Sequence, residues 1–183
     1  MRLRNRKTRG RDAGGWLAWC AAPGPAHAWL RETGSLTARL QQSGPTTVQR
    51  LAQGLRRPSR DERRVLRLAA GRVAPVREVV LRVAGRVAVY AHTVANRAAW
   101  KLLRRAGRRP LATVLFADPR IKAGPLYYRQ LDARHALHRA AAVWCAGAVP
   151  RRLPARRALF TRGAARLLVT EVFLPWPQDR AAA

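Results

Sequence analysis

VREVVLRVAGRVAVYAHTV, residues 76–94, is the stretch that decides the fold. Two runs rich in β-branched residues flank an Ala-Gly pair at 84–85, a pattern typical of an antiparallel hairpin with a two-residue turn. A second hairpin is predicted near the C-terminus, where RRALFTRG (156–163) is followed by ARLLVTEVFLP (165–175). Antiparallel hairpins combined with helical segments predict an α+β domain built around a single antiparallel sheet.

The segments outside the hairpins are mainly helical in pattern. Gly107 is expected to end one helix, and Pro110 can open the next because proline is tolerated at the first helical position. A Ser-Gly-Pro break at 43–45 ends an earlier helical pattern, and the polar stretch that follows to about residue 64 predicts no definite element. The predicted helices cover 14–42 in short pieces, which include HAWLRETGSLTARLQQ (27–42), and then 95–106, 110–116 and 133–146. A strand is predicted at 126–132 and a loop rich in Pro and Arg at 147–157.

The chain has 183 residues, enough for one compact domain. We expect a flexible basic arm at 1–13, one domain at 14–177 and a short tail at 178–183. The apolar run WLAWCAA (16–22) lies at the lower limit of a signal-peptide core and is followed at once by Pro-Gly-Pro, so export is not expected. The two cysteines, Cys20 and Cys145, fit the reduced thiols of a cytoplasmic protein, and no run approaches the ~18–20 apolar residues of a membrane span.

The charge of the chain is unusual, because 37 Lys and Arg against 9 Asp and Glu give a net charge of +28. Nucleic-acid binding depends on such residues, and a basic nucleic-acid-binding protein is therefore one alternative. The arginines, however, are scattered through every segment rather than gathered in one stripe. We therefore expect the charge to attract a small anionic substrate and predict no specific nucleic-acid partner.

Two charged side chains are predicted on apolar faces of strands. Side chains alternate along a strand, so Arg77 shares its face with three valine and leucine residues. Glu171 lies in a strand whose two faces are both apolar, as in a central strand. Such charges must be paired or functional, and both a mutual buried salt bridge and a ligand-binding role are open. The planar guanidinium favours the ligand role slightly, because it suits a carboxylate.

Other candidate residues carry weaker signals. The chain has no phosphate-binding loop, dinucleotide fingerprint, nucleophile elbow or zinc-protease motif. His135 and His138 lie three residues apart on a predicted helix, but no acid or cysteine has the spacing of a further zinc ligand. Asp61-Glu62 is typical of a solvated pair or a helix start. The sequence therefore predicts no metal site.

Four segments resemble the chorismate lyase family and stand in the family's order. The resemblance spans about residues 14–177 and implies an antiparallel sheet with helices and a buried site covered by helical flaps. It also implies a carbon–oxygen lyase that converts chorismate into 4-hydroxybenzoate and pyruvate in ubiquinone biosynthesis, in the cytoplasm and without a cofactor. The segments are AWLRETGSLTARLQQSG (28–44), VREVVLRVAGRVAVYAHT (76–93), GRRPLATVLF (107–116) and LLVTEVFLP (167–175), of which the last is the most specific.

The resemblance implies roles for residues at matching positions. Arg77 would grip the ring carboxylate and Glu171 would hydrogen-bond the ring hydroxyl, as the two catalytic residues. Leu111 would add a backbone contact at a helix start, and Leu36, where the family commonly has methionine, would shield the site. His92 stands where the family usually has an arginine that helps to bind the carboxylates. Histidine cannot match the bidentate fork of arginine, so a neighbouring arginine could take over this role.

A non-catalytic ligand-binding module is the other alternative. The same kind of fold resembles the effector domains of some bacterial transcription regulators, which normally carry a DNA-binding domain ahead of them. Only a short arm precedes the predicted domain here, which favours the enzyme. We expect a monomer whose partner is the small molecule chorismate.

Overall fold

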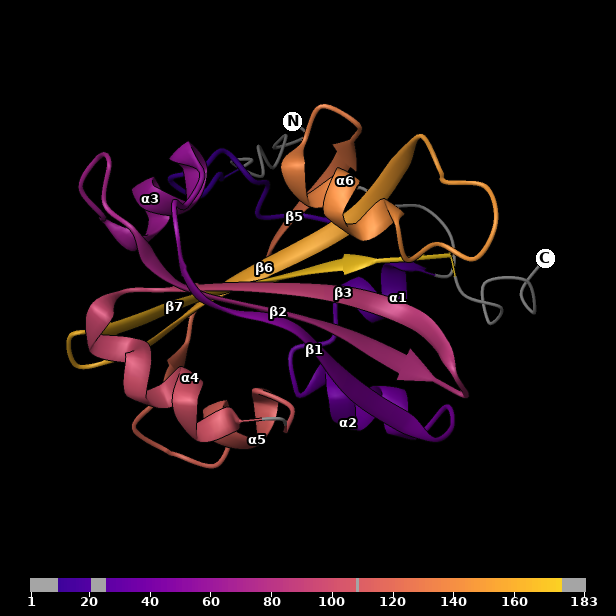
Figure 1. Cartoon of the computed structure of the whole chain (residues 1–183), viewed down its shortest axis with the longest axis horizontal. Coiled ribbons are helices and arrows are strands. Elements are labelled where there is room, and N and C mark those ends of the chain that lie inside the picture. The colour runs from indigo at the N-terminus through magenta and orange to yellow at the C-terminus, as the bar shows by residue number, and fades with distance from the viewer. Residues whose placement is uncertain (1–9, 21–25, 108, 176–183) are drawn as a thin grey trace, which may run out of the picture.

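The computed structural model describes residues 10–20, 26–107 and 109–175. Within these residues one antiparallel sheet has seven strands in the order β1-β2-β3-β7-β6-β4, and β5 pairs with another part of β6 (Figure 1). This architecture confirms the predicted α+β class. The strands are β1 Thr46–Arg56, β2 Ala74–Val83, β3 Arg86–Ala95, β4 Lys122–Ala123, β5 Tyr127–Asp132, β6 Arg152–Arg162 and β7 Ala165–Phe173.

The helices are short, and apart from α3 they lie close to where the sequence predicts helical segments. The helix that was expected to end at Gly107 does so, and Gly107 has a positive φ of 54°. The helices are α1 Ala26–Leu30, α2 Leu36–Gln41, α3 Arg60–Leu66, η1 Arg97–Ala99, α4 Trp100–Ala106, α5 Ala112–Leu115 and α6 Ala136–Ala142.

The central hairpin forms as predicted. Ala84 and Gly85 join β2 to β3 with φ values of 48° and 80°, the geometry of a type I′ turn whose twist matches that of the flanking strands. The closing hairpin joins β6 to β7, and β3 pairs with β7. The two predicted hairpins therefore meet in the middle of the sheet.

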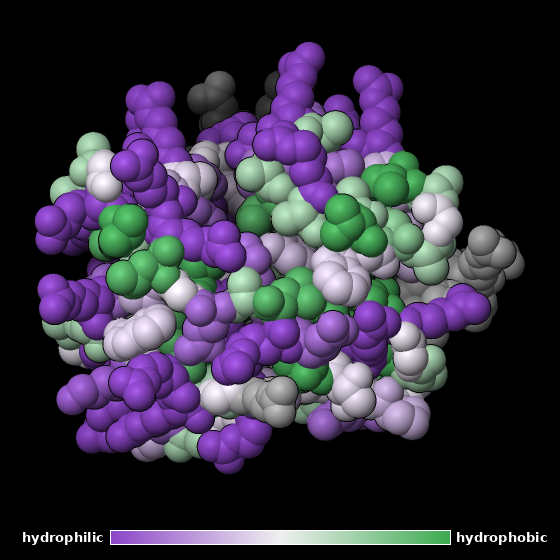
Figure 2. All heavy atoms as spheres, viewed as in Figure 1, coloured by the Kyte–Doolittle hydropathy of each residue, from purple (hydrophilic) through white to green (hydrophobic). Residues whose placement is uncertain are grey.

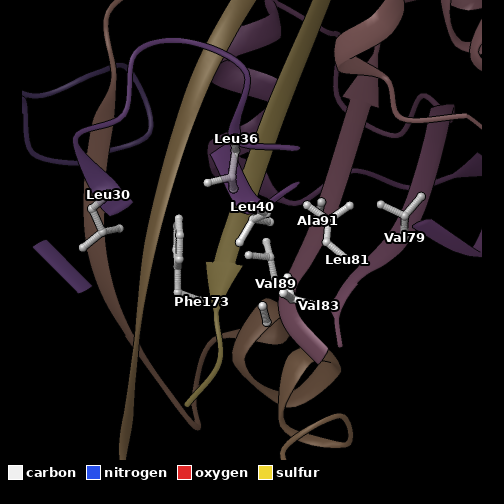
Figure 3. Packing of buried hydrophobic residues seen from close by; sticks show 10 residues of the cluster. Leu30, Leu36, Leu40, Val79, Leu81, Val83, Val89, Ala91 and Phe173 are labelled. Carbon is white, nitrogen blue, oxygen red and sulfur yellow. The ribbon is translucent and has the colours of Figure 1, made fainter. Parts of the chain in front are cut away.

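Helices cover both faces of the sheet. α2, α4 and α5 lie on one face, and α3 and α6 lie on the other (Figure 1). On the first face Leu36 and Leu40 of α2 stand over the strands that carry Val89 and Phe173 (Figure 3). Leu137 of α6 belongs to a separate buried cluster on the second face. Because side chains alternate along a strand, each central strand contributes to both clusters.

The polar stretch after residue 45 forms β1 and α3. β1 is an edge strand with many exposed residues, which explains why its sequence lacks a clear hydrophobic pattern. α3 begins with a capping box, in which the Ser59 hydroxyl accepts from the Glu62 N–H and the Glu62 carboxylate accepts from the Ser59 N–H. Asp61-Glu62 therefore marks a helix start, although Glu62 itself is buried.

The prediction of a loop at 147–157 was wrong in its second half, because β6 begins at Arg152. Pro154 cannot donate a backbone hydrogen bond, which argues against a central strand. At this point, however, β6 pairs only with β5, and its pairing with β7 starts at Ala155. The strand therefore has one unpaired side where the proline lies.

The folded domain also begins earlier than predicted. Asp12, expected to lie in the basic arm, pairs with the buried Arg157 of β6. Asp12 is therefore fastened to the sheet, whereas residues 10, 11 and 13 are exposed. Residues 1–9 of the expected arm and the expected tail at 178–183 lie outside the described residues.

Candidate active site

Four of the five residues that the sequence singles out line one cavity. Arg77 of β2, Glu171 of β7, Leu36 of α2 and Leu111, which precedes α5, border a space of about 510 Å³. The cavity lies between the sheet and the helices that cover its first face. Its volume falls within the range of small-molecule sites.

Arg77 carries a buried cation without a counter-charge. The side chain is 2% exposed, and no carboxylate among the described residues pairs with it. Its Nη2 donates to the carbonyl oxygens of Gly107 (3.3 Å) and Arg109 (2.9 Å), while its Nε has no hydrogen-bond partner. Burial lowers the pKa of Arg77, and the nearby cation of Arg50 lowers it further. An anion in the cavity would offset this unfavourable placement.

Glu171 pairs with Arg156 rather than with Arg77. The Nε of Arg156 lies 2.6 Å from Oε2 of Glu171, on the neighbouring strand. The alternative of a buried salt bridge between Arg77 and Glu171 is therefore wrong. Arg156 was not predicted as a site residue, although the sequence carries a signal for it. A two-residue turn at 163–164 sets a register that places residue 156 opposite residue 171.

The sheet register sets the spacing of the two predicted catalytic residues. Arg77 lies opposite Thr93 of β3, and Glu171 lies opposite Ala91 of the same strand. Two strand spacings and one two-residue step separate the Cα atoms of Arg77 and Glu171, or about 12 Å. The small side chains of Ala91 and Thr93 line the cavity between them. One six-membered ring, with a carboxylate near Arg77 and a hydroxyl near Glu171, suits this floor.

Arg156 also holds the segment that covers the cavity. Its Nη1 donates to the backbone carbonyls of Trp29, Leu30 and Glu32 at the end of α1. A cation at this position also interacts favourably with the C-terminal carbonyls of a helix. The α1–α2 segment is therefore tied to the sheet through the same guanidinium that pairs with Glu171.

The structure does not bring His92 to this cavity, which corrects its expected part in carboxylate binding. Its neighbours Ala91 and Thr93 line the cavity, so the alternation of side chains points His92 to the opposite face. There its Nε2 lies 3.1 Å from Oε1 of Glu62, and its Nδ1 lies 3.2 Å from Oε1 of Glu78. Burial lowers the pKa of His92, but the two carboxylates outweigh this effect and raise the pKa to about 9.

Arg157 follows Arg156 in β6 and faces the opposite side of the sheet. Its Nε lies 2.7 Å from Oδ2 of Asp12, and its Nη1 lies 2.7 Å from Oδ2 of Asp61. Burial raises the pKa of Asp61, but hydrogen bonds from Ser59 and Arg157 outweigh burial and keep that pKa below its usual range. This buried cluster fastens the N-terminal segment and α3 to the sheet.

Other candidate groups have structural surroundings. The Nδ1 of His135 accepts from the Leu137 N–H at the start of α6, and Nε2 of His138 bonds to the carbonyl of Pro150. Among the described residues, no three His, Cys, Asp or Glu side chains gather to hold a metal ion. In the same part of the chain, every helix is too short or too polar to cross a membrane.

A comparison with protein families matches residues 20–181 to the family described as chorismate lyase. The chain belongs to the chorismate lyase family. This family member is 43% identical over 155 residues to the "Probable chorismate pyruvate-lyase" of Ralstonia nicotianae, with 80% of each chain covered. It is 44% identical over 163 residues to the protein of the same name from Aromatoleum aromaticum, with 84% of this chain and 86% of that protein covered.

Solved structures show the same fold in proteins of other families. The effector domain of PhnF from Mycobacterium smegmatis has a TM-score of 0.55 and 15% identity to this chorismate lyase family member, covering 79% of this chain and 93% of that one. A GntR-family transcriptional regulator from Enterococcus faecalis has a TM-score of 0.50 and 9% identity, with 73% and 93% covered. At such low identity the likeness shows the fold alone, and it confirms the predicted likeness to effector domains.

Proposed function

We propose that the protein is a chorismate pyruvate-lyase, which converts chorismate into 4-hydroxybenzoate and pyruvate. The observation that carries this proposal is the buried guanidinium of Arg77, which lacks a carboxylate partner among the described residues and lines the same cavity as Glu171. Membership of the chorismate lyase family and the shared name of the relatives agree with it.

The residues of the cavity suggest a division of roles. Arg77 binds the ring carboxylate, because its unsatisfied cation needs an anion. Glu171 accepts a hydrogen bond from the ring hydroxyl, which substrate and product both carry. Leu111 adds a backbone contact at the start of α5, and Leu36 of α2 shields the ring from water. Ala91 leaves space for the ring on the cavity floor.

The reaction requires the protein mainly to position the substrate. The ether bond between the ring and the enolpyruvyl oxygen breaks, and its electron pair stays on that oxygen. The ring loses the hydrogen from the carbon that bears the hydroxyl and becomes aromatic, while enolpyruvate takes up a proton to give pyruvate. The protein fixes the reactive conformer and stabilises the charge that moves onto oxygen. Proton transfer within the substrate and transfer through Glu171 are both compatible with this arrangement.

The direct test is to mix the purified protein with chorismate, without added metal, and to follow both products. We expect 4-hydroxybenzoate absorbance and pyruvate to appear in equal amounts, faster than in chorismate alone. The Arg77→Ala variant should remain folded and lose most of this turnover. If the folded wild-type protein yields neither product, the proposal fails.

A second candidate function is a small-acid-binding module without turnover, because the buried cation of Arg77 beside the cavity would bind a small acid whether or not it reacts. It predicts that chorismate or 4-hydroxybenzoate binds while no pyruvate forms, so the same assay separates it from the lyase. A nucleic-acid-binding protein would instead show affinity that falls steeply with salt. Figure 2 shows hydrophilic side chains spread among hydrophobic ones on the visible face rather than gathered in one band, which gives that alternative no support.

The proposal includes the cytoplasmic location and the monomeric state expected from the sequence. Cell fractionation tests the first expectation, and size-exclusion chromatography with light scattering tests the second.

A further inference from the structure

The proposed substrate carries two carboxylates, and Arg77 accounts for only one of them. Among the described residues that line the cavity, the cationic ones are Arg77 and Arg156. They lie on the two flanks of the cavity floor, on β2 and β6, with β3 and β7 between them. A dianion that is held by Arg77 at one end therefore meets its second cation at Arg156.

Only some of the nitrogen donors of the Arg156 guanidinium have hydrogen-bond acceptors among the described residues. Its Nε donates to the carboxylate of Glu171, and its Nη1 donates to the carbonyls of the α1–α2 cover. Its Nη2 has no acceptor within the described part of the chain, although the residue is only 3% exposed. Because Arg156 lines the cavity, this third nitrogen is available to a ligand there.

We propose that Arg156 binds the enolpyruvyl carboxylate of chorismate through Nη2, and thereby selects dianionic over monoanionic ligands. The inference rests on the proposed function. In chorismate the enolpyruvyl ether and the hydroxyl are on adjacent ring carbons. Glu171 and Arg156 are directly paired on adjacent strands. A hydroxyl held by Glu171 therefore directs the neighbouring substituent toward Arg156.

Other basic residues near the sheet are less suited to this role. His92 and Arg157 face the opposite side, where each is held by two carboxylates. Arg50 shares the Gly107 carbonyl with Arg77, at the far end of the floor from Glu171. Arg156 thus supplies the second cation that the family resemblance placed at position 92.

The test compares two ligands that cannot turn over. 4-Hydroxybenzoate is a monoanion, and 4-hydroxyisophthalate is a dianion whose second carboxylate is on the ring carbon next to the hydroxyl. Calorimetric titration of the wild-type protein should show that the dianion binds at least about 10-fold more tightly. The Arg156→Gln variant should lose this preference. The Arg152→Gln variant, which removes the same charge from an exposed position of β6, should keep it.

The ratio of the two affinities separates ligand binding from support of the site. If Arg156 acts only by holding Glu171 and the cover, both ligands weaken by the same factor in Arg156→Gln, and the proposal is wrong. Equal affinities in the wild-type protein would also overturn it, and that measurement stands even if the variant does not fold. These titrations do not involve turnover, so the chorismate assay tests the lyase function separately.

Discussion

Arg77 and Arg157 are two buried arginines whose replacement should separate function from stability. They are 2% and 1% exposed, and methionine can replace each with an uncharged side chain of similar length. Arg77 donates only to backbone carbonyls, whereas Arg157 pairs with Asp12 and Asp61. We expect Arg77→Met to lower turnover strongly with little change in stability, and Arg157→Met to destabilise the fold.

The magnitudes follow from the partners of each cation. Burying the Arg77 guanidinium costs several kcal/mol, and its two charge-assisted hydrogen bonds return about 1.5–3 kcal/mol each, so its removal should change the unfolding free energy by only about 1 kcal/mol. Removing Arg157 leaves two carboxylates without their cation, which costs about 3–5 kcal/mol. In a protein of this size that loss lowers the Tm by on the order of 10 °C.

The effects of the two substitutions on activity should be in the opposite order to their effects on stability. Removing one partner of a buried charge pair costs about 2–5 kcal/mol, so Arg77→Met should lower kcat/KM for chorismate by about 30-fold to several thousand-fold. Arg157→Met should retain most turnover at low temperature, where it is still folded. Urea unfolding followed by circular dichroism gives the stabilities, and pyruvate release gives the rates.

Two results would refute this reasoning. Full turnover in Arg77→Met would remove the guanidinium from the site. Equal destabilisation of the two variants would mean that Arg77 is a structural residue like Arg157, because a buried cation without a counter-charge should contribute little net stability.

Substitutions at two further positions test the floor of the cavity and its opposite face. Ala91→Leu extends a side chain into the cavity, so turnover should fall by at least about 100-fold while the unfolding free energy changes by less than about 1 kcal/mol. Pyruvate release measures the first effect, and urea unfolding measures the second. The raised pKa of His92, about 9, means that its pairing with Glu62 and Glu78 stabilises the fold fully below the unfolded value of about 6.5 and is lost as the pH rises through about 9. Between about pH 6 and pH 10, the unfolding free energy of the wild-type protein should therefore fall more than that of His92→Gln, by at most about 3 kcal/mol. Urea unfolding at each pH measures this difference. Parallel pH profiles for the two proteins would contradict the pairing of His92 with Glu62 and Glu78. His92→Arg should bring no gain in kcat/KM, because position 92 faces away from the cavity.

Part of the fold could be predicted because local chemistry determined it. The Ala84-Gly85 pair between two β-rich runs could be recognised as a hairpin turn, and Gly107 as a helix end. β1 could not be recognised, because an edge strand exposed to solvent has no alternation of apolar and polar residues. The β5–β6 pairing was hidden by Pro154, which is acceptable only because β7 does not extend beside it.

Site residues could be predicted where the sequence pattern of a single strand was sufficient. The apolar faces around Arg77 and Glu171 marked both as buried charges, and the structure places both on the same cavity. The role implied for His92 rested on its matching position in the chorismate lyase family. The direction of its side chain follows instead from the alternation of side chains along β3, which points His92 away from Ala91 and Thr93. The partners of Arg157 could not be predicted, because Asp12 and Asp61 are 145 and 96 residues away in sequence.

The adjacent residues Arg156 and Arg157 show why composition gives little information about function in this chain. They share a residue type, a strand and nearly complete burial, yet alternation sends them to opposite faces of the sheet. On one face the cation meets Glu171 and the substrate-sized cavity, and on the other it meets two carboxylates that neutralise it. A net charge of +28 counts both equally. What distinguishes them is how the acceptors are shared among the guanidinium nitrogens. Each of the three nitrogens of Arg157 has a carboxylate acceptor. Nη2 of Arg156, like Nε of Arg77, has none among the described residues. Unsatisfied donors on buried cations, rather than the excess of arginine, are therefore the feature that points to an anionic substrate.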